Sequence, residues 1–253
     1  MVTDQVSRVD NQTAVFRLAE EQESRADLAL RQEVKFVVSR DDVSTIRKLL
    51  ESNGRRLVYN EPVSTVRSIY FDDIGMTACR ANLGGVGHRR KVRLRWYDSL
   101  VPKKNVFFEI KWRKNRITGK HRIPLEVQGS LSGVPYRQIV DDLVGVLPSA
   151  HVADLLESNE PVVIVEYKRE HFAARDSALR VTLDYDLVFY DQTGKQCISS
   201  SFPQPMHDTV IVEGKTSPGG EQDVKDFLYP LRPRISAFSK YVHACNLLGL
   251  VSM

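Results

Sequence analysis

Charged residues separated by a single residue recur along the sequence. In Lys91-Val-Arg-Leu-Arg-Trp three basic residues alternate with apolar ones, and in Phe107-Phe-Glu-Ile-Lys-Trp an acid and a base do so. The same acid–x–base spacing occurs in Glu33-Val-Lys and Glu213-Gly-Lys. The guanidinium of arginine donates two parallel hydrogen bonds to phosphate oxygens, and lysine supplies a mobile positive charge. Carboxylates bind Mg²⁺ or Mn²⁺. Together these residue types are typical of a phosphoryl-transfer site.

The spacing predicts β-strands, because side chains two residues apart on a strand leave the same face of the sheet. The alternation marks eight segments, at 33–39, 65–72, 90–97, 105–113, 119–124, 162–170, 178–190 and 209–215. Helices are predicted at 41–52 (capped by Ser39 or Asp41 and stopped by Gly54), at 136–146 and 150–157 around Pro148, and at 239–250. So few helices exclude an alternating βαβ plan and favour an antiparallel α+β domain, open or closed into a barrel.

For a single strand, the simplest explanation of a charged face is exposure to solvent on the outside of a sheet. Repetition over at least four strands favours a different arrangement, in which the charged faces meet and line a lumen. Basic side chains in a lumen repel one another and lose hydration, unless water, interspersed carboxylates or a polyanion compensates them. The obvious polyanion is a chain of phosphates.

Composition narrows the class of protein. The 253 residues include 36 Lys and Arg against 32 Asp and Glu, a net charge of +4 that is too small for a general nucleic-acid or membrane coat. Cys79, Cys197 and Cys245 form no CxxC pair, which argues against a zinc site or a disulfide framework and for a reducing, cytoplasmic location. No apolar run is long enough to cross a bilayer, and the polar N-terminus is unlike a secretory signal.

The first 30 residues are polar and contain neither Gly nor Pro, and we expect either a tail or a helix over 14–30. The folded domain is expected to cover residues 31–253. Two glycine-containing motifs are set aside: Gly214-Lys-Thr lacks the first glycine of a P-loop, and Gly84-Gly-Val-Gly lacks the dinucleotide spacing. The six histidines show no metal-ligand spacing and are interpreted as surface or packing residues.

Several segments, in order, resemble the VTC domain, the polyphosphate polymerase domain of vacuolar transporter chaperone complexes, which also occurs as a stand-alone bacterial protein. They are Arg31-Gln-Glu-Val-Lys-Phe, Val66-Arg-Ser-Ile-Tyr-Phe-Asp, Arg89-Arg-Lys-Val-Arg-Leu-Arg-Trp-Tyr, Phe108-Glu-Ile-Lys, Glu213-Gly-Lys and Phe238-Ser-Lys-Tyr-Val. The resemblance spans residues 31–250 and implies the fold of the triphosphate tunnel metalloenzymes (CYTH-like superfamily), an eight-stranded antiparallel closed barrel with flanking helices around a charged tunnel.

The resemblance also implies roles for individual residues. Catalytic roles fall on Arg93, Arg95, Lys111, Arg169 and Lys240, and substrate-binding roles on Lys35, Arg67, Arg122, Tyr167, Arg180, Lys215 and Ser239. The metal-binding role falls on Glu213, with Glu33 and Glu109 as further carboxylates that either bind the metal or orient the lysines. Tyr167 and Arg169 alternate with Glu166 and Lys168, so only one of these two pairs can face the tunnel without a bulge. The resemblance favours Tyr167 and Arg169.

The expected function is therefore a metal-dependent phosphotransferase that moves the γ-phosphate of ATP onto inorganic polyphosphate, with Mn²⁺ or Mg²⁺ as cofactor. Two alternatives stay open: a triphosphatase or polyphosphatase of the same fold, in which water is the acceptor, and a non-catalytic polyphosphate-binding module. The expected partners are ATP and polyphosphate rather than nucleic acid. The chain has no membrane span of its own, which leaves a membrane partner and the oligomeric state open.

Overall fold

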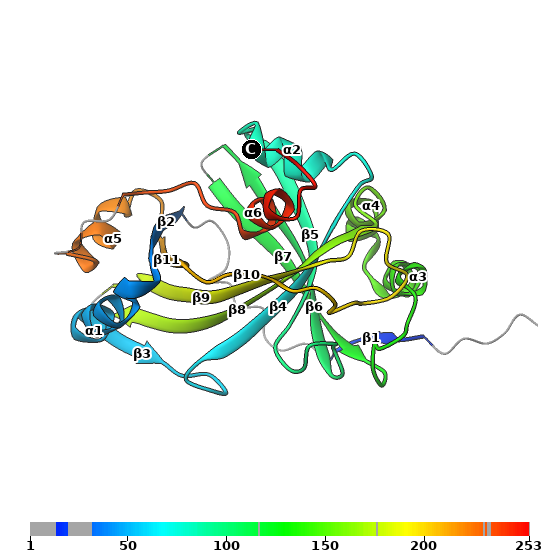
Figure 1. Ribbon diagram of the computed structural model, residues 1–253, viewed down its shortest axis with the longest axis horizontal. Helices are drawn as coiled ribbons and strands as arrows, with labels where there is room; N and C mark the ends of the chain where they lie inside the picture. The colour runs from blue at the N-terminus through cyan, green and yellow to red at the C-terminus, as the bar shows by residue number, and fades with distance from the viewer. Residues whose placement is uncertain are drawn as a thin grey trace, which may run out of the picture.

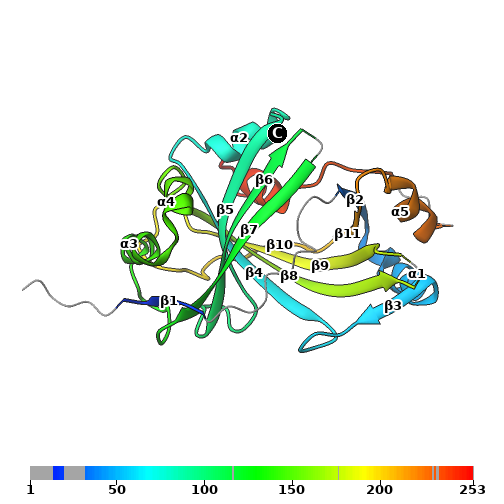
Figure 2. The same cartoon turned by 180° about the vertical axis from the view of Figure 1, so that it is seen from behind.

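The computed structural model describes residues 14–19, 32–115, 117–175, 177–229, 231 and 234–252. One antiparallel sheet of eleven strands forms its centre, and helices flank the sheet (Figures 1 and 2). The strands are β1 (Phe16–Leu18), β2 (Gln32–Ser39), β3 (Gly54–Leu57), β4 (Ser64–Asp72), β5 (His88–Trp96), β6 (Asn105–Lys114), β7 (Ile117–Val127), β8 (Glu160–Ala174), β9 (Arg180–Asp191), β10 (Gln204–Met206) and β11 (Thr209–Thr216). The helices are α1 (Val43–Asn53), preceded by a 3₁₀ turn (Arg40–Asp42), α2 (Thr77–Leu83), α3 (Tyr136–Val146), α4 (Ser149–Leu156), α5 (Glu221–Phe227) and α6 (Lys240–Leu247).

The strands pair in the order β1-β7-β6-β5-β4-β8-β9-β11-β2, with β10 added to β9 and β3 to β8. The sheet is strongly twisted, so that β5, β6 and β7 cross β8 and β9 steeply in Figures 1 and 2. The α+β class with a large antiparallel sheet is thus confirmed. Among the described residues no ladder joins β2 to β1 or β7, and closure into a barrel stays a prediction.

All eight predicted strands form, as do the four predicted helical segments. The prediction of a helix over 14–30 is wrong at Phe16–Leu18, which forms β1 and pairs with Leu125–Val127 of β7. Residues 1–13 and 20–31 lie outside the described part of the chain, so the rest of that segment stays a prediction. Two short strands (β3 and β10) and two helices (α2 and α5) were not predicted.

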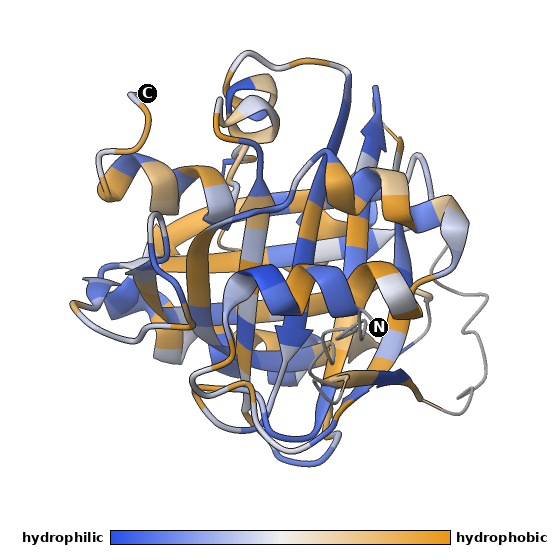
Figure 3. Ribbon diagram, turned by 90° about the vertical axis from the view of Figure 1, so that its right-hand side faces the viewer, coloured by the Kyte–Doolittle hydropathy of each residue, from blue (hydrophilic) through white to orange (hydrophobic). Residues whose placement is uncertain are grey.

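The helices bury the apolar side of the sheet. Helices α3 and α4 cover β5 and β6, where Phe108 and Ile110 are almost completely buried, while α1 and α5 pack on the other end of the sheet through Leu50 and Val224 (Figure 1). The alternation of hydrophobic and hydrophilic residues is visible as colour bands across the strands in Figure 3. In the described residues, no helix is both long and apolar enough for a bilayer crossing.

Helix α6 packs on the opposite side of β4. Tyr241 stacks on Tyr70 with ring centroids 4.9 Å apart, and its hydroxyl donates to Asp72 Oδ2 at 2.7 Å. The carboxylate of Asp72 also accepts the backbone amides of Ala78 and Cys79, which ties α2 to the same point. These contacts fix the N-terminus of α6, and therefore Ser239 and Lys240, beside the charged side of the sheet.

Candidate functional site

Because successive side chains on a strand point to opposite faces of the sheet, the charged side chains lie on one face and the core residues on the other. On β5, Val92 and Leu94 belong to the hydrophobic core under α3 and α4, whereas Arg93 and Arg95 leave the other face and are still more than nine-tenths buried. Antiparallel pairing then places inward-facing residues of neighbouring strands side by side. Arg93, for example, lies opposite Glu109 of β6. The charged side of the sheet is thus an interior surface rather than a solvated one.

We call the side chains gathered on this surface the charged cluster. Its basic members are Lys35, Lys91, Arg93, Arg95, Lys111, Lys120, Arg122, Arg169, Lys215 and Lys240, and its acidic members are Glu33, Glu109, Asp184 and Glu213. They come from β2, β5, β6, β7, β8, β9, β11 and the start of α6. Because the basic side chains outnumber the carboxylates by more than two to one, the cluster has an excess of positive charge.

Glu109 is the counter-ion of the first group of bases. Its Oε2 accepts from Arg93 Nε at 2.8 Å, while Lys120 Nζ and Arg122 Nε lie 3.6 and 3.4 Å from Oε1. Burial by itself would raise the pKa of the fully buried Glu109, but these cations, together with Arg95, hold it well below its usual value. This environment favours a role in holding the arginines over the metal-binding role predicted for Glu109.

Asp184 organises the second group. Arg169 grips it in a bidentate pair, with Nε to Oδ1 at 2.6 Å and Nη2 to Oδ2 at 2.7 Å, and Lys240 Nζ donates to Oδ2 at 2.5 Å. Burial opposes ionisation, but Arg169 and Lys240 lower the pKa of Asp184 to about 2. The two basic residues predicted from separate parts of the sequence, on β8 and α6, therefore meet at one carboxylate.

Two aromatic residues contact the basic side chains, and one of them, Tyr167, reaches both groups. Arg93 Nη1 donates to the hydroxyl of Tyr70 at 2.7 Å, and Arg95 Nη2 lies 3.3 Å from the hydroxyl of Tyr167. Lys240 Nζ sits over the ring of Tyr167, 4.6 Å from its centroid. The predicted facing of β8 is therefore confirmed, since Tyr167 and Arg169 belong to the cluster while Lys168 is exposed and pairs with Asp186.

A third contact joins distant strands of the sheet. Lys111 Nζ of β6 donates to Glu33 Oε2 of β2 at 2.6 Å, although five strands lie between β6 and β2 in the hydrogen-bonded order. The sheet must curve for this contact to form. Burial acts to raise the pKa of Glu33, but Lys111, with help from Lys35, lowers it to about 2.

Glu213 is the least tightly held of the four carboxylates. Its Oε1 lies 3.3 Å from Lys215 and its Oε2 lies 3.8 Å from Lys35, whereas the other three each accept a hydrogen bond of 2.8 Å or less. Burial disfavours the charged form, yet Lys215 and Lys35 keep the pKa of Glu213 well below its usual value. An ionised carboxylate without a close partner fits a ligand for Mg²⁺ or Mn²⁺.

A complete metal cage is not built from protein groups. In the ranges that the structure describes, no three His, Cys, Asp or Glu residues are grouped to hold an ion. This agrees with Mg²⁺ chemistry at phosphate sites, where one or two carboxylates suffice because substrate oxygens and water supply the other ligands. The residues present therefore fit a metal that binds together with a phosphate chain.

Lys91 extends the cluster toward α6. It lies on the same face of β5 as Arg93, and its Nζ donates to Asn82 Oδ1 at 2.6 Å and to Ser239 Oγ at 2.7 Å. Burial and the nearby Lys35 and Lys111 hold its pKa well below the usual value for lysine. Ser239 also caps α6, where its Oγ accepts the backbone amide of Val242. The predicted binding residue Ser239 is thus brought into the cluster.

Of the remaining predicted residues, Lys35 donates to the carbonyl of Phe238 at 3.1 Å, and Arg180 lies opposite Lys215 in the β9–β11 ladder. Arg67 is the exception. It pairs with Glu166 at 2.5 Å and donates to the carbonyl of Asp98, on the face of β4 opposite to the cluster. The assignment of Arg67 to the lining is wrong, because inward positions on β4 are the even-numbered ones, such as Ser68 and Tyr70.

Sequence reasoning placed Lys91 on the charged face of its strand without giving it a role, and it missed three members of this surface: Lys120, Asp184 and His171. Lys120 and Asp184 stand two residues from predicted or polar inward positions, so strand parity could have found them. His171 follows Arg169 on β8 and faces Thr182. Burial and the cations Arg169 and Lys215 lower its pKa to about 4, so its interpretation as a surface or packing residue was incomplete.

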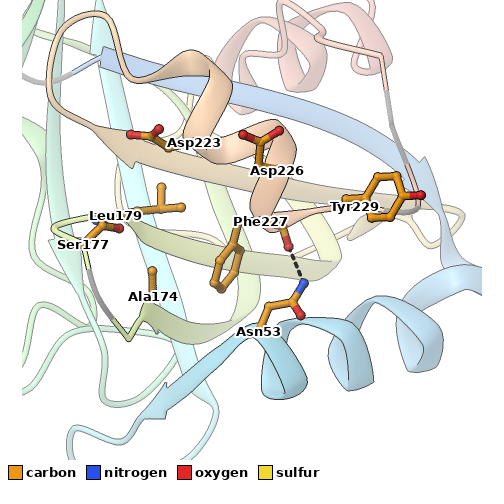
Figure 4. A pocket seen from close by; sticks show the side chains of 8 residues that line it. All are labelled: Asn53, Ala174, Ser177, Leu179, Asp223, Asp226, Phe227 and Tyr229. Carbon is orange, nitrogen blue, oxygen red and sulfur yellow. Dashed lines mark hydrogen bonds between the residues drawn. The ribbon is translucent and has the colours of Figure 1, made fainter.

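Three buried polar atoms of this surface lack a hydrogen-bond partner: Glu109 Oε1, Arg122 Nε and Thr182 Oγ1. Such atoms are rare in native proteins and are satisfied by water or a ligand. A separate cavity of about 490 Å³ lies between α5, the end of α1 and the β8–β9 turn (Figure 4). None of the described residues that line that cavity is basic, and Asp223 and Asp226 would repel phosphate, so it is not the candidate site.

Comparison with known proteins agrees with this arrangement of fold and charge. No match to the chain was found among the curated proteins. The profile of the VTC domain matches residues 30–249, which is most of the chain and includes every member of the charged cluster. The chain belongs to the VTC domain family.

Proposed function

We propose that the protein is a polyphosphate polymerase, which transfers the γ-phosphate of ATP onto the end of an inorganic polyphosphate chain. The main support is the convergence of basic side chains from six strands and α6 on one buried surface. VTC domain membership supports the same substrate class. We also propose that the sheet closes around this surface as a tunnel, for which the Glu33–Lys111 contact between β2 and β6 is the principal argument.

In the proposed reaction a terminal phosphate oxygen of the acceptor attacks the γ-phosphorus of ATP in line. The bond from the γ-phosphorus to the β–γ bridging oxygen breaks, and ADP leaves with the electron pair. Arg93, Arg95 and Lys111 would neutralise the phosphate oxygens, while Arg169 and Lys240 would hold the chain near Asp184. Positioning and charge neutralisation supply most of the acceleration in this class of reaction.

The proposed cofactor is Mn²⁺ or Mg²⁺, held by Glu213 with Glu33 as a second candidate ligand. When bound, such an ion would offset the negative charge that develops on the phosphate oxygens. Glu213→Gln keeps the shape of the side chain but removes its charge. We expect this variant to require a higher metal concentration for half-maximal activity.

The activity is tested by incubating the protein with ATP and Mn²⁺ and separating the products on a gel that resolves polyphosphate. Polymer together with ADP supports the proposal; free phosphate without polymer would make the protein a hydrolase of the same fold; tight binding without turnover would make it a binding module. Lys240→Ala should lose most of the turnover. Lys168→Ala is the matched control, because Lys168 lies on the opposite face of β8 and is exposed. Equal turnover of both variants would contradict the proposed site.

A further inference from the structure

One edge of the charged cluster carries an aromatic surface that phosphate binding does not use. Phe107 lies opposite Arg95 in the β5–β6 ladder, and the guanidinium of Arg122 covers its ring at 3.7 Å from the centroid. Tyr97 packs edge-on against Phe107, with centroids 6.0 Å apart and an interplanar angle of 71°. We call Tyr97, Phe107 and Arg122 the stacking platform.

The platform is accessible, unlike the arginines beside it. Tyr97 is 41% exposed, whereas Arg93 and Arg95 are less than 10% exposed. Tyr97 directly follows the last residue of β5, and about two-fifths of its surface is open to solvent and therefore to a ligand. The guanidinium of Arg122 is fixed by Phe107 on one side and by Glu109 at 3.4 Å. Its buried Nε nevertheless has no hydrogen-bond partner.

Flat, electron-rich rings are the ligands that suit this chemistry. Nucleobases stack on tyrosine rings and on arginine guanidinium planes, and both surfaces are present within one platform. The platform borders Arg95, Glu109 and Lys120, so a base stacked there would direct its phosphates into the first group of the charged cluster.

We propose that the stacking platform binds the nucleobase of a nucleoside triphosphate and so sets the end of the cluster at which the nucleotide enters. The inference rests on the proposed function, since it assigns the nucleoside part of the same substrate. It also predicts that the base of ATP contributes to the binding affinity. A site for inorganic phosphate chains alone would show no such contribution.

The test compares two ligands by calorimetry in EDTA, where no turnover occurs: ATP and inorganic tripolyphosphate. Tyr97→Ala should weaken ATP binding about tenfold and leave tripolyphosphate binding unchanged, because alanine substitution removes a base-stacking contact. Tyr97→Phe should restore ATP affinity, since the ring and not the hydroxyl makes the contact. Tyr59→Ala is the matched control, because Tyr59 is 46% exposed and packs edge-on against His171, away from the platform.

Each result has a distinct meaning. Equal effects of Tyr97→Ala on both ligands, or no effect on either, would overturn the nucleobase site while leaving the phosphate site intact. A loss of ATP affinity in Tyr59→Ala but not in Tyr97→Ala would place the base at the other aromatic pair and overturn the assignment. If the wild-type protein binds neither ligand, the proposed function itself fails.

Discussion

Three carboxylates of the charged cluster hold basic side chains that a phosphate chain could also bind. Glu109 orients Arg93, Asp184 orients Arg169 and Lys240, and Glu33 orients Lys111. Without these acids, the bases would repel one another in a dry interior. With them, the guanidinium and ammonium groups are already in place, and each retains donors for a ligand. The acids are therefore as important to the site as the bases.

Lys120 offers a test at the level of one residue. Burial lowers its pKa to about 8, with Arg122 and Arg95 acting in the same direction and Glu109 opposing them. As pH rises through 8, the free protein therefore loses this positive charge, whereas bound phosphate would keep Lys120 protonated. Proton linkage then predicts that affinity for tripolyphosphate falls about tenfold between pH 7 and pH 9.

The measurement is calorimetric titration with tripolyphosphate at pH 7, 8 and 9 at constant ionic strength. Lys120→Arg keeps the charge at all three values and reports the titration of the ligand alone. The difference between wild type and Lys120→Arg isolates the lysine. Parallel pH profiles for the two proteins would show that Lys120 does not contact the phosphate chain.

Strand parity explains why so much of the site could be predicted at the residue scale. Because residues two apart on a strand share a face, Arg93 is expected beside Arg95 and Tyr167 beside Arg169. The structure places each pair on one face of its strand. Parity alone does not say which face is inside, and this is how Arg67 was misplaced. Its pairing with Glu166 depends on the register between β4 and β8, which the sequence of one strand does not specify.

At the scale of elements, long segments with a clear period could be predicted and short ones could not. Strand β10 has three residues including Pro205, and β3 begins with Gly54, so neither carries a measurable alternation. Helix α2 begins directly after Met76, whose backbone is in the left-handed region with a φ of 57°. No local sequence pattern predicts this conformation. Such elements are stabilised by tertiary contacts rather than by their own sequence.

Gly214 shows how an element positions the site. It stands between Glu213 and Lys215, with α5 packed directly on its outer side, so that an added Cβ would lie 2.3 Å from Val224 Cγ1. Gly214→Ala should therefore push α5 away from β11 and lower the free energy of unfolding by about 1–3 kcal/mol. Displacement of β11 should also weaken tripolyphosphate binding, because it moves Glu213 and Lys215.

Gly145 in α3 is the matched glycine. A Cβ there would meet nothing within 4 Å, and alanine is the better helix former, so Gly145→Ala should raise the free energy of unfolding by about 0.5–1 kcal/mol. Urea unfolding of both variants, followed by circular dichroism, gives the two changes. Effects of the same sign would contradict the packing argument for Gly214.

At the scale of the whole molecule, the charge is distributed unevenly. The net charge of the chain is only +4, yet the charged cluster alone has a larger imbalance of bases over acids. Composition could not reveal this, because the rest of the chain carries slightly more acidic than basic residues, many of them in pairs such as Arg67–Glu166 and Arg90–Glu157. Nor could the sequence reveal that β2 meets β6, since this contact depends on how the sheet curves.

The concentrated charge makes the stability of the whole fold depend on a polyanion. At a concentration of one hundred times its dissociation constant, tripolyphosphate should raise the free energy of unfolding by about 2.7 kcal/mol. For a chain of this size, the midpoint of thermal unfolding should then rise by about 5–10 °C. Because the bases gather around three separate carboxylates, Glu109, Asp184 and Glu33, one phosphate cannot reach them all. Orthophosphate at the same ionic strength should therefore give a much smaller shift, and added NaCl should reduce the shift from tripolyphosphate. Thermal melts with both anions distinguish this cumulative attraction from a general salt effect, since equal shifts would mean that the cluster binds single phosphates independently.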